Sequence, residues 1–299
     1  MTVAPDFPAS GSTVPAARRP WPDRIAATGN GASALWREVA RREPAYLATC
    51  VLIAVSIAPV LLAHGIDPRT VGPAPIAEPI WLKPLKFQFA LLVYLATLAL
   101  FALARPERPR RPRAYRAFTW VVASAVALEI VWIAGAAAMG TTSHFNTGTP
   151  VGAAIYSAMG AAAVVLTSAS LVTGAMIARG GMGDAALRTG LAWGLALTFA
   201  LTLVVAGTLS ARTGHLVGEA ITGARVPILG WSREAGDLRV AHFLATHAMH
   251  AVPLLALLAA RSLPPLPARR LTVLAAAAYA GLVALAFAQA LAGRPVLPL

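Results

Sequence analysis

Half of the six histidines gather near the start of one long apolar stretch: His242, His247 and His250. On a helix, His247 and His250 share a face, whereas His242 and His247 differ by about 140° at ~100° per residue. One ion is therefore not expected to bind all three. The pattern favours a site that combines one or two of these imidazoles with His144 from an earlier loop. Imidazoles suit Zn, Cu, Fe or a haem, so a metal ion or haem is the cofactor hypothesis. The alternative is that these histidines are interfacial or hydrogen-bonded and bind nothing.

One glutamate and two lysines are further candidates for chemistry, and we treat Glu129, Lys83 and Lys86 as candidate catalytic residues. Glu129 lies in the middle of an apolar stretch, where a carboxylate costs several kcal/mol unless it is protonated or paired. It could serve as a proton relay, a metal ligand or a substrate anchor, or it is a protonated side chain bonded to a neighbouring helix. Lys83 and Lys86 are the two lysines of the chain, against 23 arginines. They offer a tunable ammonium or a point charge for an anionic group, or they are lysines that extend from a helix end to the interface.

A polar turn surrounds His144, with the sequence TTSHFNTGTP over residues 141–150. Ser143 and Asn146 flank the histidine, so we regard both as substrate-binding or orienting candidates. The alternative is that the turn caps the next helix, for which Thr149 followed by proline is well suited.

A second polar segment precedes the histidine-bearing helix, with the sequence GWSREAGDLRVAHF over residues 230–243. Asp237 can cap that helix, and it could orient Arg239 or His242 as carboxylates do for metal ligands. A salt bridge at the start of the helix is the alternative. Trp231 and Arg239 join Asp237 as candidates for binding a substrate or supporting a ligand.

Seven apolar stretches of about 20 residues or more carry these side chains, long enough to cross a ~30 Å hydrocarbon core. They are Tyr46–Ala63, Leu85–Ala104, Ala117–Met139, Gly152–Ala178, Leu187–Ser210, Val240–Ala260 and Leu271–Ala292. The sequence thus predicts an all-α, polytopic membrane helix bundle of about seven transmembrane helices over residues 45–293. A basic, largely disordered N-terminal tail (1–44) is expected before it and a short outer tail (294–299) after it.

The basic residues predict the orientation of this bundle. The tail and three alternate loops hold 17 of the 25 Lys and Arg, with six arginines in residues 105–116 alone. By the positive-inside rule the N-terminus is cytoplasmic, the C-terminus is outside, and the histidines lie toward the outer side of the inner (plasma) membrane. Because of this placement, the basic residues behind the net charge of +13 are expected to contact the lipid bilayer and not nucleic acid. The last stretch has no lysine, which excludes a retinal protein, and the single Cys50 excludes an intramolecular disulfide.

Three segments also resemble a known family: WLKPLKF (81–87), TSHFNTGTP (142–150) and GWSREAGDLRVAHFLATHAMH (230–250). They are similar to an uncharacterised family of bacterial multi-pass integral membrane proteins with KPxKF, SHFN and GDxRxxHFxxxH motifs, over most of residues 78–260. The resemblance implies the membrane architecture and the same candidate residues, and it names no activity. A glutamine is usual where this chain has His250, so the resemblance favours His144, His242 and His247 as ligands.

Three functions stay open on the sequence, and so does whether the protein is an enzyme. The first is a metal- or haem-binding redox protein, with Glu129 handling a proton and Lys83 or Lys86 facing an anionic quinone or substrate. The second is a small-solute permease or sensor that binds its ligand directly with the same groups. The third is a non-catalytic scaffold of the cell envelope. The oligomeric state is not indicated by any of these patterns.

Overall fold

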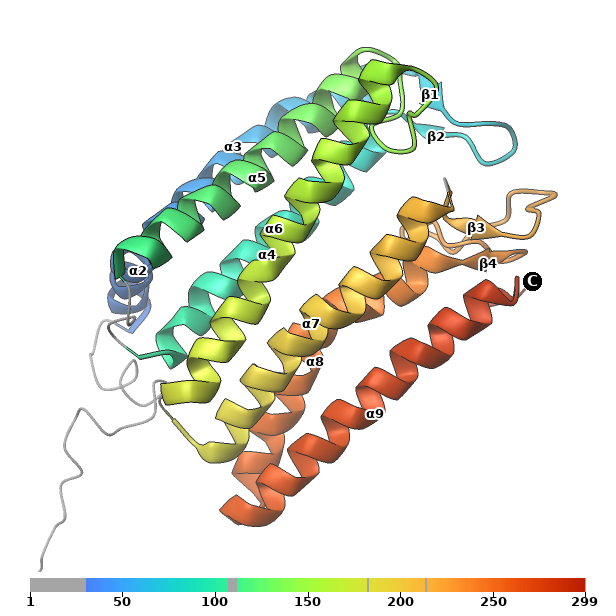
Figure 1. Ribbon diagram of the computed structural model, residues 1–299. Coiled ribbons are helices and arrows are strands. Elements are labelled where there is room, and N and C mark those ends of the chain that lie inside the picture. The colour runs from blue at the N-terminus through green and yellow to red at the C-terminus, as the bar shows by residue number, and fades with distance from the viewer. Residues whose placement is uncertain (1–30, 107–111, 182, 213, 299) are drawn as a thin grey trace, which may run out of the picture.

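The computed structural model describes residues 31–106, 112–181, 183–212 and 214–298. In these residues seven helices are long and apolar enough to cross a membrane (Figure 1). They are α3 (Pro44–Ile66), α4 (Leu82–Phe101, continued by the short η2, Ala102–Ala104), α5 (Pro112–Ala138), α6 (Pro150–Gly180), α7 (Ala185–Ala211), α8 (Leu238–Ser262) and α9 (Pro265–Leu291). The predicted all-α membrane bundle is confirmed, and the protein is a multi-pass integral membrane protein.

Each helix begins two to six residues before its apolar stretch, so the predicted starts were too late. The reason is that proline or polar residues form the first turns outside the hydrocarbon region. Pro44, Pro112, Pro150 and Pro265 each begin a helix, a position where the missing N–H of proline costs nothing. Within the predicted N-terminal tail, residues 31–42 form a further helix, α2 (Gly31–Arg42). The rest of that tail, residues 1–30, lies outside the described residues.

The two ends of the bundle differ. One end, here called the hairpin end, carries the first loop (residues 67–81), the polar turn (139–149) and the long loop (214–237). Two antiparallel pairs of two-residue strands shape these loops: β1 (Thr70–Val71) with β2 (Glu78–Pro79), and β3 (Leu216–Val217) with β4 (Gly236–Asp237). The opposite, short-loop end carries α2, η2 and the close connections between α6 and α7 and between α8 and α9.

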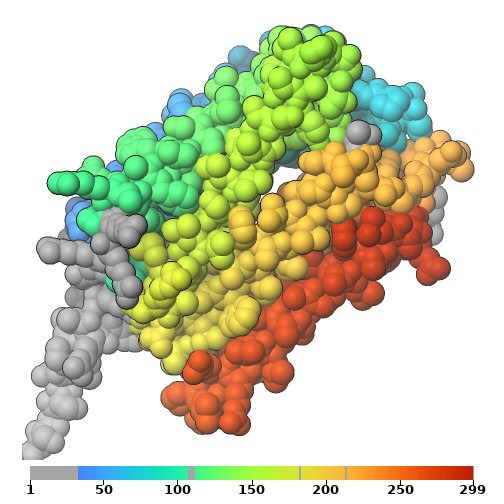
Figure 2. Space-filling view, in the orientation of Figure 1, coloured from blue at the N-terminus to red at the C-terminus, as the bar shows by residue number. Residues whose placement is uncertain are grey.

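Close packing joins α7 to its neighbours. A Cβ placed on Gly194 would lie 2.8 Å from Pro253 Cδ and 2.9 Å from the Ala248 carbonyl, so the backbones of α7 and α8 are nearly in contact. Toward the short-loop end, α6 approaches α7 in the same way, where a Cβ on Gly174 would be 3.0 Å from Leu195 Cβ. Toward the hairpin end the surface is hollowed between α6 and α7 (Figure 2). α6 and α7 are therefore closely packed toward the short-loop end and separated toward the hairpin end.

Candidate functional site

Both lysines lie in the first two turns of α4, at the hairpin end. Trp81, the N-cap residue of α4, donates its indole N–H to Asp67 Oδ2 at 2.7 Å, which fixes the start of the helix against the first loop. The Lys83 ammonium lies 5.9 Å from the centroid of the Phe87 ring. Within the described residues, neither Lys83 nor Lys86 has a carboxylate oxygen within 4.0 Å or a hydrogen-bond partner.

The backbone of the long loop passes close to these lysines at Gly230. A Cβ placed there would lie 3.2 Å from Lys86 Nζ and 3.4 Å from Glu78 Oε1. Gly230 also has φ +74°, a left-handed conformation that favours glycine. Glu78 acts electrostatically on both Lys83 and Lys86. The Glu78 carboxylate is therefore shared electrostatically by two ammonium groups, and among the described residues it forms a close ion pair with neither of them.

Glu129 is buried in α5 and acts electrostatically on Lys83. Its side chain is 3% exposed, and Oε1 has no hydrogen-bond partner among the described residues. The charged group that acts on it is Lys83. A buried acceptor without a donor costs roughly 1–3 kcal/mol, so packing alone gives no reason to keep a glutamate here. The alternative prediction, a carboxyl bonded to a neighbouring helix, finds no support in the part of the chain that the structure describes.

The turn that carries His144 has an unusual backbone. Phe145 has φ +61°, a conformation that side chains other than glycine, asparagine and aspartate seldom adopt. The Ser143 side chain is buried, its carbonyl accepts the Trp132 indole N–H at 2.9 Å, and its Oγ lies 3.1 Å from His144 Nδ1. Asn146 donates to Thr141 Oγ1 at 3.3 Å, within the same turn. The candidates Ser143 and Asn146 thus hold the shape of the turn around His144. The predicted cap of α6 by Thr149 is also present.

Aromatic rings surround the His144 imidazole. Its centroid lies 5.5 Å from that of Phe87, 6.5 Å from Phe145 and 6.3 Å from Tyr156. Burial, together with the positive charge of Lys83, lowers the pKa of His144 to about 3. His144 is therefore neutral near physiological pH, and it can donate or accept a hydrogen bond without carrying charge.

The histidines of α8 form a separate group. The His247 ring stacks on Phe243 with centroids 4.0 Å apart, and its centroid lies 5.2 Å from that of His250. His250 Nε2 is 3.0 Å from Thr97 Oγ1, a contact between α8 and α4. His242 lies partly buried one turn nearer the hairpin end. Among the described residues, no group of three or more His, Cys, Asp and Glu side chains is placed to hold a metal ion. The geometry lends no support to the predicted ligand set of His144, His242 and His247.

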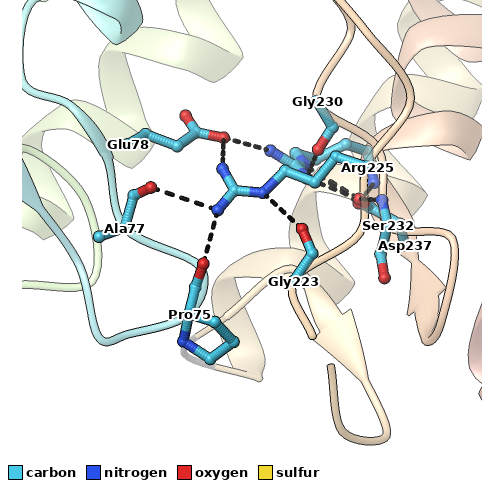
Figure 3. Close-up of polar contacts among 9 residues, drawn as sticks. Pro75, Ala77, Glu78, Gly223, Arg225, Gly230, Ser232 and Asp237 are labelled. Atoms are coloured by element: carbon cyan, nitrogen blue, oxygen red, sulfur yellow. Dashed lines mark hydrogen bonds and ion pairs between the residues drawn. The ribbon is translucent and has the colours of Figure 1, made fainter. Parts of the chain in front are cut away.

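An arginine of the long loop closes the hairpin end (Figure 3). Arg225 donates to Glu78 Oε1 at 3.1 Å, to the Pro75 carbonyl at 3.1 Å and to the Ala77 carbonyl at 3.2 Å. These contacts, which we call the clasp, tie the loop between α7 and α8 to the loop between α3 and α4. Neither Arg225 nor Glu78 was among the site residues predicted from the sequence. The one indication was an arginine in a loop predicted to lie outside, where positive charge is disfavoured.

Asp237 and Arg239 support this arrangement. Asp237 is 2% exposed, caps α8 by accepting the Arg239 N–H at 3.0 Å, and accepts the Ser232 N–H at 3.0 Å. The Arg239 guanidinium pairs with Asp237 at 2.7 Å and donates to the Gly230 carbonyl at 2.6 Å. Burial acts to raise the pKa of Asp237, but the bonds from Arg239 outweigh it and hold the pKa below its ordinary value. The predicted cap and the salt bridge at the start of the helix are both present. Trp231 packs edge-on against Phe243.

A second polar cluster lies buried at the short-loop end. Arg105, 3% exposed, pairs with the fully buried Glu43, which also accepts the Tyr115 hydroxyl at 2.9 Å. Glu43 Oε2 and the Arg105 Nε and Nη1 atoms have no partner among the described residues. On the sequence Arg105 is one of the basic residues that predict the orientation, and its burial was not expected.

Comparison with protein-family models, with curated proteins and with solved structures finds no match. The family resemblance of the three motifs stays an expectation.

Proposed function

We propose that this protein binds a small anionic solute at Lys83 and Lys86 and acts as a permease or sensor of the inner (plasma) membrane, with the hairpin end outside. The observation that carries the proposal is the pair of partly buried lysines that have no close carboxylate and no hydrogen bond among the described residues. An ammonium group removed from water is costly unless an anion pairs with it. A solute anion would supply the missing partner.

The charges around the lysines support an anionic ligand. Basic groups outnumber acidic ones here: Lys83, Lys86, Arg225 and Arg239 face Glu78, Asp237 and Glu129. The two arginines are engaged by Glu78 and Asp237, which leaves the lysines. Lys83 and Lys86 are separated by ~4.5 Å along the helix at ~1.5 Å per residue, a spacing that suits two oxygens of one carboxylate or sulfonate.

The start of α4 adds to this preference. The N-cap residue Trp81 makes no side-chain cap, and the first turn of α4 contains no acidic residue. The backbone N–H groups of a helix N-terminus favour negative charge. Lysines at this position are unfavourable for the empty helix, and they become favourable when an anion binds between them and the helix end.

Isothermal titration of the purified full-length protein with acetate, benzoate and methanesulfonate tests the proposal. Hydrogen bonds to charged groups contribute about 1.5–3 kcal/mol, so Lys83→Gln or Lys86→Gln should each weaken binding about tenfold or more. Arg233→Gln is the matched control. It removes a positive charge at the same end, but Arg233 donates to the Pro298 carbonyl and is outside the lysine pair. If none of the anions binds, or if the double lysine variant binds them as well as the unmodified protein, the proposed function is wrong.

A further inference from the structure

We propose that Glu129 takes up a proton when the anion binds, so that the protein binds its solute and a proton together. This inference rests on the proposed function and adds the role of the one acidic group within α5. Its basis is the environment of Glu129, which is buried, has no hydrogen bond to Oε1 among the described residues, and interacts electrostatically with the same lysine that the anion would use.

The elements packed around α5 bring few charges to Glu129. α4 contributes Lys83 and, one turn away, Lys86. α3 contains no Asp, Glu, Lys or Arg, and its titratable groups are Tyr46, Cys50 and, in the last turn, His64. α6 presents Tyr156 near the hairpin end and Arg179 at the opposite end. The first loop adds Arg69, which donates to the Ala138 carbonyl at the end of α5. The charge of Lys83 is thus the main influence on whether Glu129 is ionised.

Lys83 interacts electrostatically with Glu129 and also belongs to the proposed anion site, so it couples the two. In the empty protein the Lys83 ammonium favours the ionised Glu129 carboxylate, since opposite charges stabilise each other. A bound anion pairs with the Lys83 ammonium, which then stabilises the Glu129 carboxylate less. The anion also adds a negative charge close to Glu129. Both effects favour the protonated carboxyl. The uptake of a proton keeps the number of negative charges around the lysines unchanged.

The nearby histidine does not compete for this proton. The pKa of His144 is lowered to about 3 by burial and by the positive charge of Lys83, so its imidazole stays neutral at the pH of the titration proposed for Glu129. The rings of Phe87, Phe145 and Tyr156 enclose it further. His144 can accompany a proton transfer as a hydrogen-bonding group, but the charge change belongs to Glu129.

Coupling of this kind is reciprocal, so the anion affinity must depend on pH. Uptake of one proton per anion strengthens binding by up to about tenfold for each unit that the pH falls. Lysine protonation changes the affinity in the same direction. The substitution Glu129→Gln separates the two, because it keeps the lysines and mimics the protonated carboxyl.

The experiment is titration of the full-length protein with acetate and methanesulfonate in two buffers that differ in ionisation enthalpy, from about pH 8 to about pH 6. The difference between the buffers gives the number of protons taken up per anion. We expect uptake approaching one proton in the unmodified protein and close to none in Glu129→Gln, which should still bind the anion. Infrared difference spectra should show a protonated carboxylic acid appearing on anion binding, and this band should be missing in Glu129→Gln.

A control and two contrary outcomes make the test decisive. Glu234→Gln removes a carboxylate at the same end that is held by the backbone N–H groups of Thr222, Gly223 and Ala224, and it should leave proton uptake unchanged. Anion binding without proton uptake in the unmodified protein, or uptake that persists in Glu129→Gln, overturns this inference and leaves the proposed function intact. Failure of every anion to bind overturns the proposed function as well.

Discussion

Gly194 allows α7 and α8 to approach each other, and adding one methyl group there should destabilise the protein. The Cβ of alanine at this position would lie 2.8 Å from Pro253 Cδ and 2.9 Å from the Ala248 carbonyl oxygen. Neither neighbour is the end of a flexible side chain, because one is a proline ring and the other is backbone. The helices must therefore move apart to accept Gly194→Ala.

A second glycine of the same helix provides the control. Apart from its chain neighbours and the nearby backbone of its own helix, no heavy atom of the described residues lies within 4 Å of a Cβ placed on Gly207. Replacing a helical glycine by alanine gains up to about 1 kcal/mol of helix propensity at either site. Overpacking costs about 1–3 kcal/mol, and only Gly194→Ala incurs it. The difference between the two variants, about 2 kcal/mol, isolates the close packing of α7 against α8.

Thermal unfolding of the two variants in one detergent measures this difference. At roughly 3 °C per kcal/mol, Gly194→Ala should unfold about 6 °C below Gly207→Ala. Gly207→Ala should unfold at or slightly above the temperature of the unmodified protein. Equal unfolding temperatures for the two variants would show that α7 and α8 are not in close contact at Gly194.

Three further predictions concern the clasp, the polar turn and the buried ion pair. Arg225→Gln should release the long loop, which hydrogen–deuterium exchange would detect as at least severalfold faster exchange there than in Arg233→Gln. Burial holds the pKa of His144 at about 3 against 6.5 for a free imidazole, so between these values the unfolded chain binds a proton that the folded protein does not. Stability therefore falls as the pH is lowered from about 6.5 toward 3, and His144→Phe should reduce that fall in a series of melting curves. Arg105→Ala should lower the free energy of unfolding by about 3–5 kcal/mol, because it leaves Glu43 buried without its partner. A loss below about 1 kcal/mol, measured by denaturant titration, would contradict a buried ion pair.

The helices could be predicted from the sequence because a membrane imposes one simple requirement. Every spanning segment must satisfy its own backbone hydrogen bonds and expose apolar side chains, and both properties are visible in a run of about 20 residues. The caps at Thr149 and Asp237 were predicted for a similar reason, since a cap depends on residues within one turn. Burial of Glu129 followed from its place in the middle of an apolar stretch.

Contacts between distant segments could not be predicted in this way. The clasp joins Arg225 to Glu78, which are 147 residues apart, through an ion pair and two backbone carbonyls. Nothing in either loop specifies that pairing. The burial of Arg105 was missed because a cluster of arginines beside a helix normally indicates orientation, and its buried partner Glu43 lies on another helix boundary.

The position of the clasp at the far end of the bundle has a mechanical consequence. α7 has 27 residues and is ~40 Å long at ~1.5 Å per residue, and it is held closely against α6 near Gly174, toward the other end. If α7, α8 and α9 turned as one body by about 5° about that end, the tip of α7 would travel roughly 3.5 Å. Hydrogen bonds near 3.1 Å do not survive a displacement of that size. A change of about 5° in the angle of these helices would therefore be enough to break the hydrogen bonds of Arg225 at the hairpin end.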